Sequence, residues 1–195
     1  MKTTARANSN IALIKYWGKK DERLNTPAVG SISLTLDGLH TTTTVVFEQN
    51  LENDILVLNG SPASADEAQR VSRFLDLVRA EAGVSWKARV QSENNFPTAA
   101  GLASSASGFA ALALAGSRAA GLEMSMAKLS LLARRGSGSA ARSVFGGFVE
   151  MTAGTRPDGS DSLARQLHEK SHWDIRLIVA LTSESSKKTG STQRE

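Results

Sequence analysis

The sequence predicts an α+β fold, and three observations lead to this class. Candidate strands come first along the chain, candidate helices are interspersed later, and no regular βαβ repeat is present. The length of 195 residues is sufficient for one domain with a substantial core, or for one domain and the start of another. Hydrophobic residues make up 41% of the chain and charged residues 22%, as is typical of globular proteins.

Four stretches with β-branched or alternating apolar residues are predicted to be strands: residues 31–36, 41–48, 54–60 and 86–92. "DGLH" separates the first two and "NLEND" follows the second, so we expect a meander of antiparallel strands. The apolar "IALI" near the N-terminus is expected to be the core of another strand, and "DIRLIVAL" near the end of the chain to be the last.

Helices are predicted by their capping residues. Ser64 followed three residues later by Glu67 is a capping box, and Gly83 marks the end of the first helix. A second helix is expected over about residues 102–120, and a third over "SMAKLSLLARR".

Composition excludes several classes of protein. Cysteine is absent, which rules out disulfides and thiolate metal sites and fits a reducing cytoplasm. No apolar stretch approaches the roughly 20 residues that span a bilayer, and "MKTTARANSN" lacks the apolar core of a secretory signal. His40, His168 and His172 have no obvious companion ligand, so no protein-bound metal site is predicted. We therefore expect a cytoplasmic protein without a membrane partner.

The charge pattern favours a small phosphorylated ligand over nucleic acid. The net charge is +4 and the pI is about 9.6, which is compatible with either partner. Only 5% of the residues are aromatic, however, and the basic residues are dispersed or lie beside Gly/Ser loops. We therefore expect no nucleic-acid partner.

The segment "PTAAGLASSASG" leads into the second predicted helix and is the first candidate anion site. A Gly-rich loop at a helix N-terminus offers free backbone N–H groups and the positive end of the helix dipole. It matches neither a Walker A loop nor a dinucleotide-binding fingerprint, and a capped core helix is an equally open interpretation. The candidate phosphate-binding residues are Thr98, Gly101, Ser104, Ser105 and Ser107.

Two further segments repeat this chemistry. In "RRGSGSAARSVFGGF" a Gly/Ser turn precedes a short helix that contains Arg142, among arginines that are costly to bury unless they meet anions. In "IKYWGKK", Lys15 and Lys19 flank an aromatic pair and a glycine and could form a cationic wall for a diphosphate. The alternatives are a solvated basic turn for the first and aromatic packing for the second. Three such segments in one chain favour a phosphorylated ligand.

Together, "NIALIKYWGKKDERLNTP", "SENNFPTAAGLASSASGFAAL" and "RRGSGSAARSVFGGF" resemble the diphosphomevalonate decarboxylase family of the GHMP kinase superfamily. The resemblance covers essentially the whole chain. It implies an N-terminal domain like the second domain of ribosomal protein S5, over residues 1–172, and the start of a ferredoxin-like C-terminal domain over residues 173–195.

The resemblance also implies a reaction and its ligands. ATP and Mg²⁺ would serve the decarboxylation of mevalonate 5-diphosphate to isopentenyl diphosphate, through phosphorylation of the 3-hydroxyl group. Ser104 and Ser105 would lie nearest the β- and γ-phosphates of ATP. The residues that would hold the substrate diphosphate are Tyr16, Lys19, Ser137, Gly138 and Ser139.

The rest of the implied site surrounds the reacting end of the substrate. Asn10 and Arg142 would face the C1 carboxylate and the 3-hydroxyl region, and Lys15 and Trp17 would shape the same pocket. Ser191 would belong to a loop that contacts the substrate.

The resemblance has one departure with consequences for activity. The family carries an aspartate near the 3-hydroxyl, in an Asp-Ala-Gly-Pro-Asn type of motif, and these 195 residues contain no such motif. We therefore expect this chain to be inactive alone, as a truncated product or as part of a complete enzyme that forms a homodimer. The alternatives are a phosphomevalonate decarboxylase, an enzyme like mevalonate 3-kinase, or a non-catalytic ATP-binding module.

Overall fold

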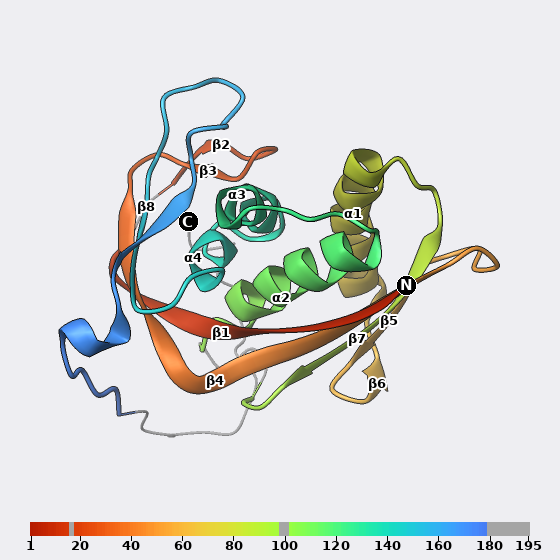
Figure 1. Cartoon of the computed structure of the whole chain (residues 1–195), viewed down its shortest axis with the longest axis horizontal. Coiled ribbons are helices and arrows are strands. Elements are labelled where there is room, and N and C mark those ends of the chain that lie inside the picture. The colour runs from red at the N-terminus through yellow and green to blue at the C-terminus, as the bar shows by residue number, and fades with distance from the viewer. Residues whose placement is uncertain (16–17, 98–101, 179–195) are drawn as a thin grey trace.

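The computed structural model describes residues 1–15, 18–97 and 102–178, in which a strongly curved sheet wraps around a group of helices (Figure 1). The sheet has seven strands in the order β6-β5-β7-β4-β8-β9, with β1 paired to β4. A separate pair of short strands, β2 and β3, forms a hairpin close to α3. The α+β class expected from the sequence is confirmed.

The elements alternate irregularly along the chain. The strands are β1 (Lys2–Ile14), β2 (Lys19–Asp21), β3 (Thr26–Pro27), β4 (Ser31–Glu48), β5 (Ile55–Leu58), β6 (Ser61–Pro62), β7 (Lys87–Asn94), β8 (Phe148–Met151) and β9 (Ala164–His168). The helices are α1 (Ala65–Ala82), α2 (Ser104–Ala119), α3 (Met126–Gly136) and α4 (Ala140–Ser143), followed by the 3₁₀ helix η1 (Lys170–His172). Within the described ranges, no helix has the length and apolar character needed to cross a membrane.

The long strand β4 organises the sheet. One of its edges pairs with β1, whereas the other pairs with β8 through residues 31–34 and with β7 through residues 41–48. The prediction that "DGLH" separates two strands is wrong, because β4 runs through it and His40 pairs with Asn8 of β1. Gly38 adopts a φ of +85°, a left-handed conformation that allows an irregularity without ending the strand.

A β-bulge in β1 turns side chains toward the helices. The register of β1 against β4 shifts between Asn8 and Asn10. Ser9 and Asn10 are consequently both buried, although neighbouring strand residues ordinarily face opposite sides. Ser9 Oγ donates a hydrogen bond of 2.9 Å to the Leu102 carbonyl, just before α2. The bulge thus delivers Asn10 to the helix-covered side of the sheet.

Helix α1 is the crossover between β5 and β7, which run parallel. A parallel pair requires such a crossover, so the expected antiparallel meander is wrong for this part of the chain. The capping box of Ser64 and Glu67 is confirmed, and Gly83 ends the helix with a φ of +66°. Leu75 and Val78 on the apolar face of α1 are fully buried in the core.

Helix α2 is the central helix and packs against β1 and β4. It begins at Ser104, close to the predicted boundary, and α3 begins after Ser125, whose hydroxyl accepts a hydrogen bond from the Lys128 backbone N–H as predicted. A side chain at Gly136 would overlap the ring of Phe109 in α2. The absence of a Cβ atom therefore lets the end of α3 approach α2 closely.

Strands β8 and β9 complete the described sheet. The amphipathic segment after residue 160 contains β9. The predicted strand over residues 174–181 is wrong for its described part, because residues 174–178 have no regular secondary structure and residues 179–181 lie outside the described ranges. The proposed domain boundary near residue 172 stays a prediction.

Candidate functional site

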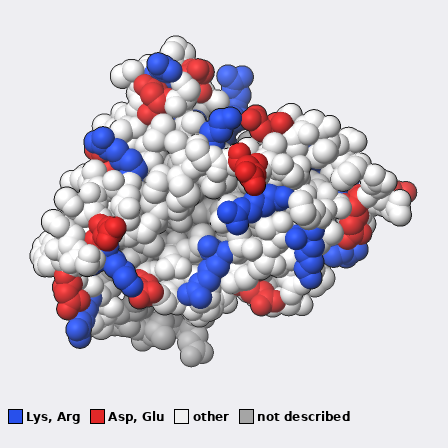
Figure 2. All heavy atoms as spheres, viewed as in Figure 1, with Lys and Arg blue, Asp and Glu red and all other residues white. Residues whose placement is uncertain are grey.

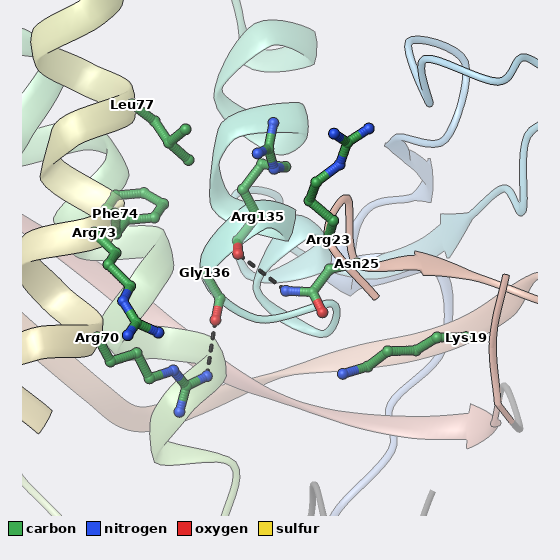
Figure 3. A pocket seen from close by; sticks show the side chains of 9 residues that line it. All are labelled: Lys19, Arg23, Asn25, Arg70, Arg73, Phe74, Leu77, Arg135 and Gly136. Carbon is green, nitrogen blue, oxygen red and sulfur yellow. Dashed lines mark hydrogen bonds between the residues drawn. The ribbon is translucent and has the colours of Figure 1, made fainter. Parts of the chain in front are cut away.

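A basic cavity of about 440 Å³ opens between α1, the end of α3 and the β2–β3 hairpin (Figure 3). Of the nine described residues that line it, five are lysine or arginine and none is acidic. The lining residues are Lys19, Arg23, Asn25, Arg70, Arg73, Phe74, Leu77, Arg135 and Gly136. Cations gathered in one cleft create a positive potential, so this cavity, called the basic pocket below, indicates an anionic ligand.

Three separate elements supply the cations of the basic pocket. Arg70 and Arg73 are three residues apart in α1 and therefore project from the same side of the helix. Arg135 comes from the last turn of α3. Lys19 extends from β2 toward the α1 side of the cavity, as Figure 3 shows, and Arg23 follows in the hairpin turn. The charge density therefore depends on how the hairpin sits against the helices.

Arg70 is fixed within the wall of the basic pocket. Its Nη2 donates a hydrogen bond of 2.8 Å to the Gly136 carbonyl, and its guanidinium lies 4.6 Å from the ring centroid of Phe109. Burial lowers the pKa of Arg70, although an arginine stays protonated at neutral pH. A charge held in place with partial desolvation is well suited to pair with phosphate oxygens.

Arg135 provides a donor that lacks a partner. Its Nε is buried and has no hydrogen-bond partner among the described residues. The carbonyl of the same residue accepts a hydrogen bond of 2.9 Å from Asn25 Nδ2 in the hairpin. A buried N–H without an acceptor is destabilising, so the Arg135 side chain carries an unsatisfied donor next to the basic pocket.

A second cavity of about 210 Å³ lies between α1, the sheet and the N-terminal part of α2. Its walls are mostly apolar, with hydroxyl and amide groups among them. The lining residues are Thr41, Thr43, Leu56, Leu58, Glu67, Arg70, Val71, Val90, Ser92, Asn94, Ser104, Ser105, Gly108, Phe109 and Leu112. Apolar walls with a few polar groups are typical of sites for flat organic groups. Because Arg70 lines both cavities, it lies between them.

Among the described residues, which do not include 98–101, no side chain caps the N-terminus of α2. The N-cap residue is Ala103, which cannot accept a hydrogen bond through its side chain, whereas α1 and α3 are capped by serines. Ala103 also has a φ of +57°, a strained conformation for a residue with a Cβ atom. Strain and uncapped N–H groups at the rim of a cavity are the features of an anion site at a helix N-terminus.

The predicted phosphate-binding serines divide into two groups. Ser104 and Ser105 line the second cavity, as their predicted role requires. Ser107 lies within α2 and is fully buried on the side that faces the sheet, where its Oγ is 2.7 Å from Thr41 Oγ1. This placement favours a packing role for Ser107 over contact with a phosphate. Thr98 and Gly101 lie outside the described residues.

Asn10 and Arg142 form a buried polar cluster with Ser31. Arg142 is only 2% exposed, and its Nη1 donates a hydrogen bond of 2.6 Å to Ser31 Oγ. Its Nη2 donates to Asn10 Oδ1 over 3.3 Å, and Asn10 Nδ2 donates to Ser143 Oγ over 2.8 Å. These bonds hold the Arg142 guanidinium between β1 and β4.

The Gly/Ser turn between α3 and α4 connects this cluster to the basic pocket. Asn10 Nδ2 donates a second hydrogen bond, of 3.0 Å, to the Ser139 carbonyl. Ser137 Oγ and Ser139 Oγ are 3.2 Å apart, on either side of the buried Gly138. The turn begins directly after Gly136, which lines the basic pocket. The structure therefore places Asn10, Ser137–139 and Arg142 close together, whereas their roles toward a substrate stay predictions.

The remaining predicted site residues are not placed in this cluster. Lys15 is exposed directly after β1. Tyr16, Trp17 and Ser191 lie outside the described residues. Their roles in shaping or contacting the substrate pocket stay predictions.

Sequence reasoning missed several residues of the two cavities. Arg70 and Arg73 were placed on a predicted helix without a functional role, although their spacing of three residues was a usable signal. Thr41 and Asn94 of the second cavity, like Ser31 of the Arg142 cluster, come from strands, and no local motif marks them. Their position at the site follows from strand pairing, which brings together residues distant in sequence.

The fold and the two cavities define a domain of the GHMP kinase class, with a mixed sheet, an uncapped helix N-terminus at one cavity and a basic cavity beside it. The family model of the diphosphomevalonate decarboxylase-like N-terminal domain matches residues 7–164. The chain belongs to this family.

Individual relatives agree with this assignment. The chain is 45% identical over 196 residues to the diphosphomevalonate decarboxylase of Candida albicans, a match that covers 94% of this chain and 54% of that protein. Mevalonate diphosphate decarboxylase from Staphylococcus aureus has a similar structure, with a TM-score of 0.81 at 49% identity over 86% of this chain and 50% of that one. MDDEF in complex with MVAPP, AMPPCP and magnesium also gives a TM-score of 0.81 at 49% identity, covering 86% of this chain and 51% of that one. The chain thus spans about half the length of the relatives it matches.

Proposed function

We propose that this domain serves the ATP-dependent decarboxylation of mevalonate 5-diphosphate to isopentenyl diphosphate and supplies binding sites for both substrates. The observation that carries the proposal is the basic pocket, where five lysine and arginine side chains line one cavity. A diphosphate offers several anionic oxygens that can meet these donors from different directions. The related MDDEF structure, a complex with MVAPP and AMPPCP, supports a diphosphate-bearing substrate and a nucleotide for this fold.

The second cavity is the proposed nucleotide site. Its apolar walls suit a base, and Ser104 and Ser105 at the uncapped start of α2 suit phosphate groups. The described residues contain no group of three or more His, Cys, Asp or Glu side chains that could hold a metal ion. Serine hydroxyls and the nucleotide phosphates would hold Mg²⁺, which would supply charge neutralisation for phosphoryl transfer.

Asn10 and Arg142 are the proposed contacts of the substrate's carboxylate and 3-hydroxyl region. Ser31 and Asn10 fix the Arg142 guanidinium, so its orientation is set before a ligand binds. The Ser139 carbonyl joins Asn10 to the Gly/Ser turn beside the basic pocket. The groups proposed to contact the carboxylate end of the substrate are thus bonded to the turn beside the pocket proposed for its diphosphate end.

Two further properties of the complete protein are proposed from the resemblance alone. These are a homodimer and a cytoplasmic location. No contact in the described ranges bears on either of them.

The proposal is tested by titrating the chain with mevalonate 5-diphosphate and with mevalonate 5-phosphate in a calorimeter. The diphosphate should bind more tightly, and Lys19→Met should weaken its binding by about tenfold, or about 1.4 kcal/mol, through loss of one charged contact. Lys2→Met is the matched control, because Lys2 is exposed at the start of β1 and lines neither cavity. Equal binding of the two ligands would favour a phosphomevalonate enzyme. Unchanged affinity in Lys19→Met would contradict the assigned diphosphate site.

A further inference from the structure

Arg134 is a buried cation that lines neither cavity, although it precedes Arg135 of the basic pocket directly. It is 3% exposed, and its hydrogen bonds go to backbone carbonyls of two other segments. Nε donates to the Leu24 carbonyl over 3.1 Å, in the turn of the β2–β3 hairpin. Nη1 donates to the Gly159 carbonyl over 2.7 Å and to the Ser162 carbonyl, in the connection between β8 and β9. One side chain thus ties α3 to two separate loops.

This arrangement is electrostatically unfavourable apart from its hydrogen bonds. Burial lowers the pKa of Arg134, and the neighbouring charge of Arg135 lowers it further, whereas Asp161 raises it. A buried guanidinium beside another cation is destabilising unless its donors are well satisfied. Its planar fork reaches carbonyls in different directions at once, which the single ammonium group of a lysine cannot do. The planar, branched guanidinium is therefore what makes arginine suitable at position 134.

The hairpin depends on outside contacts for its position. β2 and β3 pair only with each other within the described sheets, and such a short two-stranded unit is marginally stable alone. Its described side-chain tethers to α3 are the Arg134 bond to Leu24 and the Asn25 bond to the Arg135 carbonyl. The same hairpin carries Lys19 and Arg23 into the basic pocket.

Gly159 shows how closely these segments pack. A Cβ atom at this position would lie 2.9 Å from Arg134 Nη2 and 2.9 Å from Thr26 Cγ2 of β3. Gly159 also has a φ of +67°, a conformation that disfavours other residues. A substitution here would push on Arg134 and on the hairpin without altering any charge.

We propose that Arg134 is a positioning residue that clamps the β2–β3 hairpin so that Lys19 and Arg23 face Arg70 and Arg73 across the basic pocket. Its own charge does not contact the ligand. The inference rests on one part of the proposed function, namely that the basic pocket binds a diphosphate group.

The test compares inorganic diphosphate binding by Arg134→Lys and Gly159→Ala with that of the unaltered chain. Both variants keep the net charge, so a general electrostatic effect would leave the affinity for diphosphate unchanged. Loss of the clamp should instead weaken diphosphate binding by at least about tenfold. Affinity for AMPPCP should stay unchanged, since Arg134 does not line the second cavity. Hydrogen exchange at the amides of Asn25 and Ala28, which bond to Glu22 and Gly18 within the hairpin segment, should become faster relative to the core strand β4.

Arg79→Lys is the matched control for loss of a buried arginine. Arg79 is 5% exposed in α1 and bonds to Asp54 and Asp76, away from both cavities. It should lower stability without changing diphosphate affinity or hairpin exchange. If the unaltered chain does not bind inorganic diphosphate, the proposed function fails. If it binds, and Arg134→Lys and Gly159→Ala bind equally well or leave hairpin exchange unchanged, the clamp alone is refuted.

Discussion

At the scale of single residues, Arg142 shows how the structure refines a prediction from sequence. Its position after a Gly/Ser turn indicated an anion contact, but the alternative was an arginine on a solvated surface. Burial to 2% and the bond to Ser31 Oγ exclude the surface alternative. The partner Ser31 could not be predicted, because it lies 111 positions away and reaches Arg142 only through the sheet.

Replacement of Arg142 by lysine should separate its structural and binding roles. Loss of the fork breaks hydrogen bonds to Ser31 or Asn10, so the free energy of unfolding should fall by about 1–3 kcal/mol. Affinity for mevalonate 5-diphosphate should fall, but affinity for inorganic diphosphate should not, since Arg142 is assigned to the carboxylate end. Urea unfolding and calorimetric titration measure these quantities.

Ser31→Ala is the companion variant, because it removes one orienting bond and leaves the Arg142 charge in place. It should show a smaller effect in the same direction. A parallel loss of affinity for inorganic diphosphate would move Arg142 to the diphosphate end of the substrate.

At the scale of elements, helix boundaries were predictable, whereas the extent of the long strand β4 was not. The capping box at Ser64 and the left-handed Gly83 are local signals, and both act where the sequence indicated. "DGLH" contains turn-forming residues as well, but pairing with β1 carries β4 through it. Long-range pairing therefore overrides local turn preference, and a single sequence does not reveal this pairing.

The attachment of α1 to the sheet gives a prediction for pH dependence. Asp54 lies before β5 and forms an ion pair of 3.0 Å with Arg79 of α1, with both side chains 6% exposed. Burial alone would raise the pKa of Asp54, but hydrogen bonds from Arg79, Ser72 and the Ala88 backbone N–H outweigh it and lower the pKa. The ionised carboxylate therefore stabilises the fold at neutral pH.

Asp54→Asn should lower the free energy of unfolding at pH 7 by about 3–5 kcal/mol, because a buried pair loses its carboxylate. Since the pKa is lowered in the folded state, this stabilisation is complete above the unfolded-state pKa and is lost as pH falls through the folded-state pKa. The difference in free energy of unfolding between Asp54→Asn and the unaltered chain should thus shrink below about pH 4. Urea unfolding across pH 3–7 tests it, with the exposed neighbour Glu52→Gln as control. A difference that did not depend on pH would rule out this linkage.

At the scale of the whole molecule, charge is distributed in a way that suits a small ligand. Figure 2 shows basic and acidic side chains interspersed over one face, without a continuous positive stripe. The concentration of cations is local, in the basic pocket, where five of nine lining residues are basic. The low aromatic content and dispersed charge had already indicated this class of ligand, but the contribution of α1 to the pocket required the three-dimensional structure.

The two cavities share Arg70, and the buried Asn10–Arg142 cluster bonds to the turn that follows Gly136 of the basic pocket. Arg70 lies between the cavities, and the turn of residues 137–139 joins the basic pocket to the cluster. The Gly/Ser segments were recognisable in the sequence because backbone-based anion sites have a compositional signature. Arg70, Arg73 and Arg134 were not assigned a role, since their functions depend on packing between elements distant in sequence.

The central claim is that the basic pocket takes the substrate diphosphate and that the cavity beneath α2 takes the nucleotide. A crystal structure of this chain with mevalonate 5-diphosphate, AMPPCP and magnesium tests it most directly. The diphosphate should lie among Lys19, Arg70 and Arg135, the nucleotide phosphates should lie at Ser104 and Ser105, and the substrate carboxylate should face Asn10 and Arg142. A nucleotide in the basic pocket, or a substrate diphosphate bound outside it, would contradict the claim.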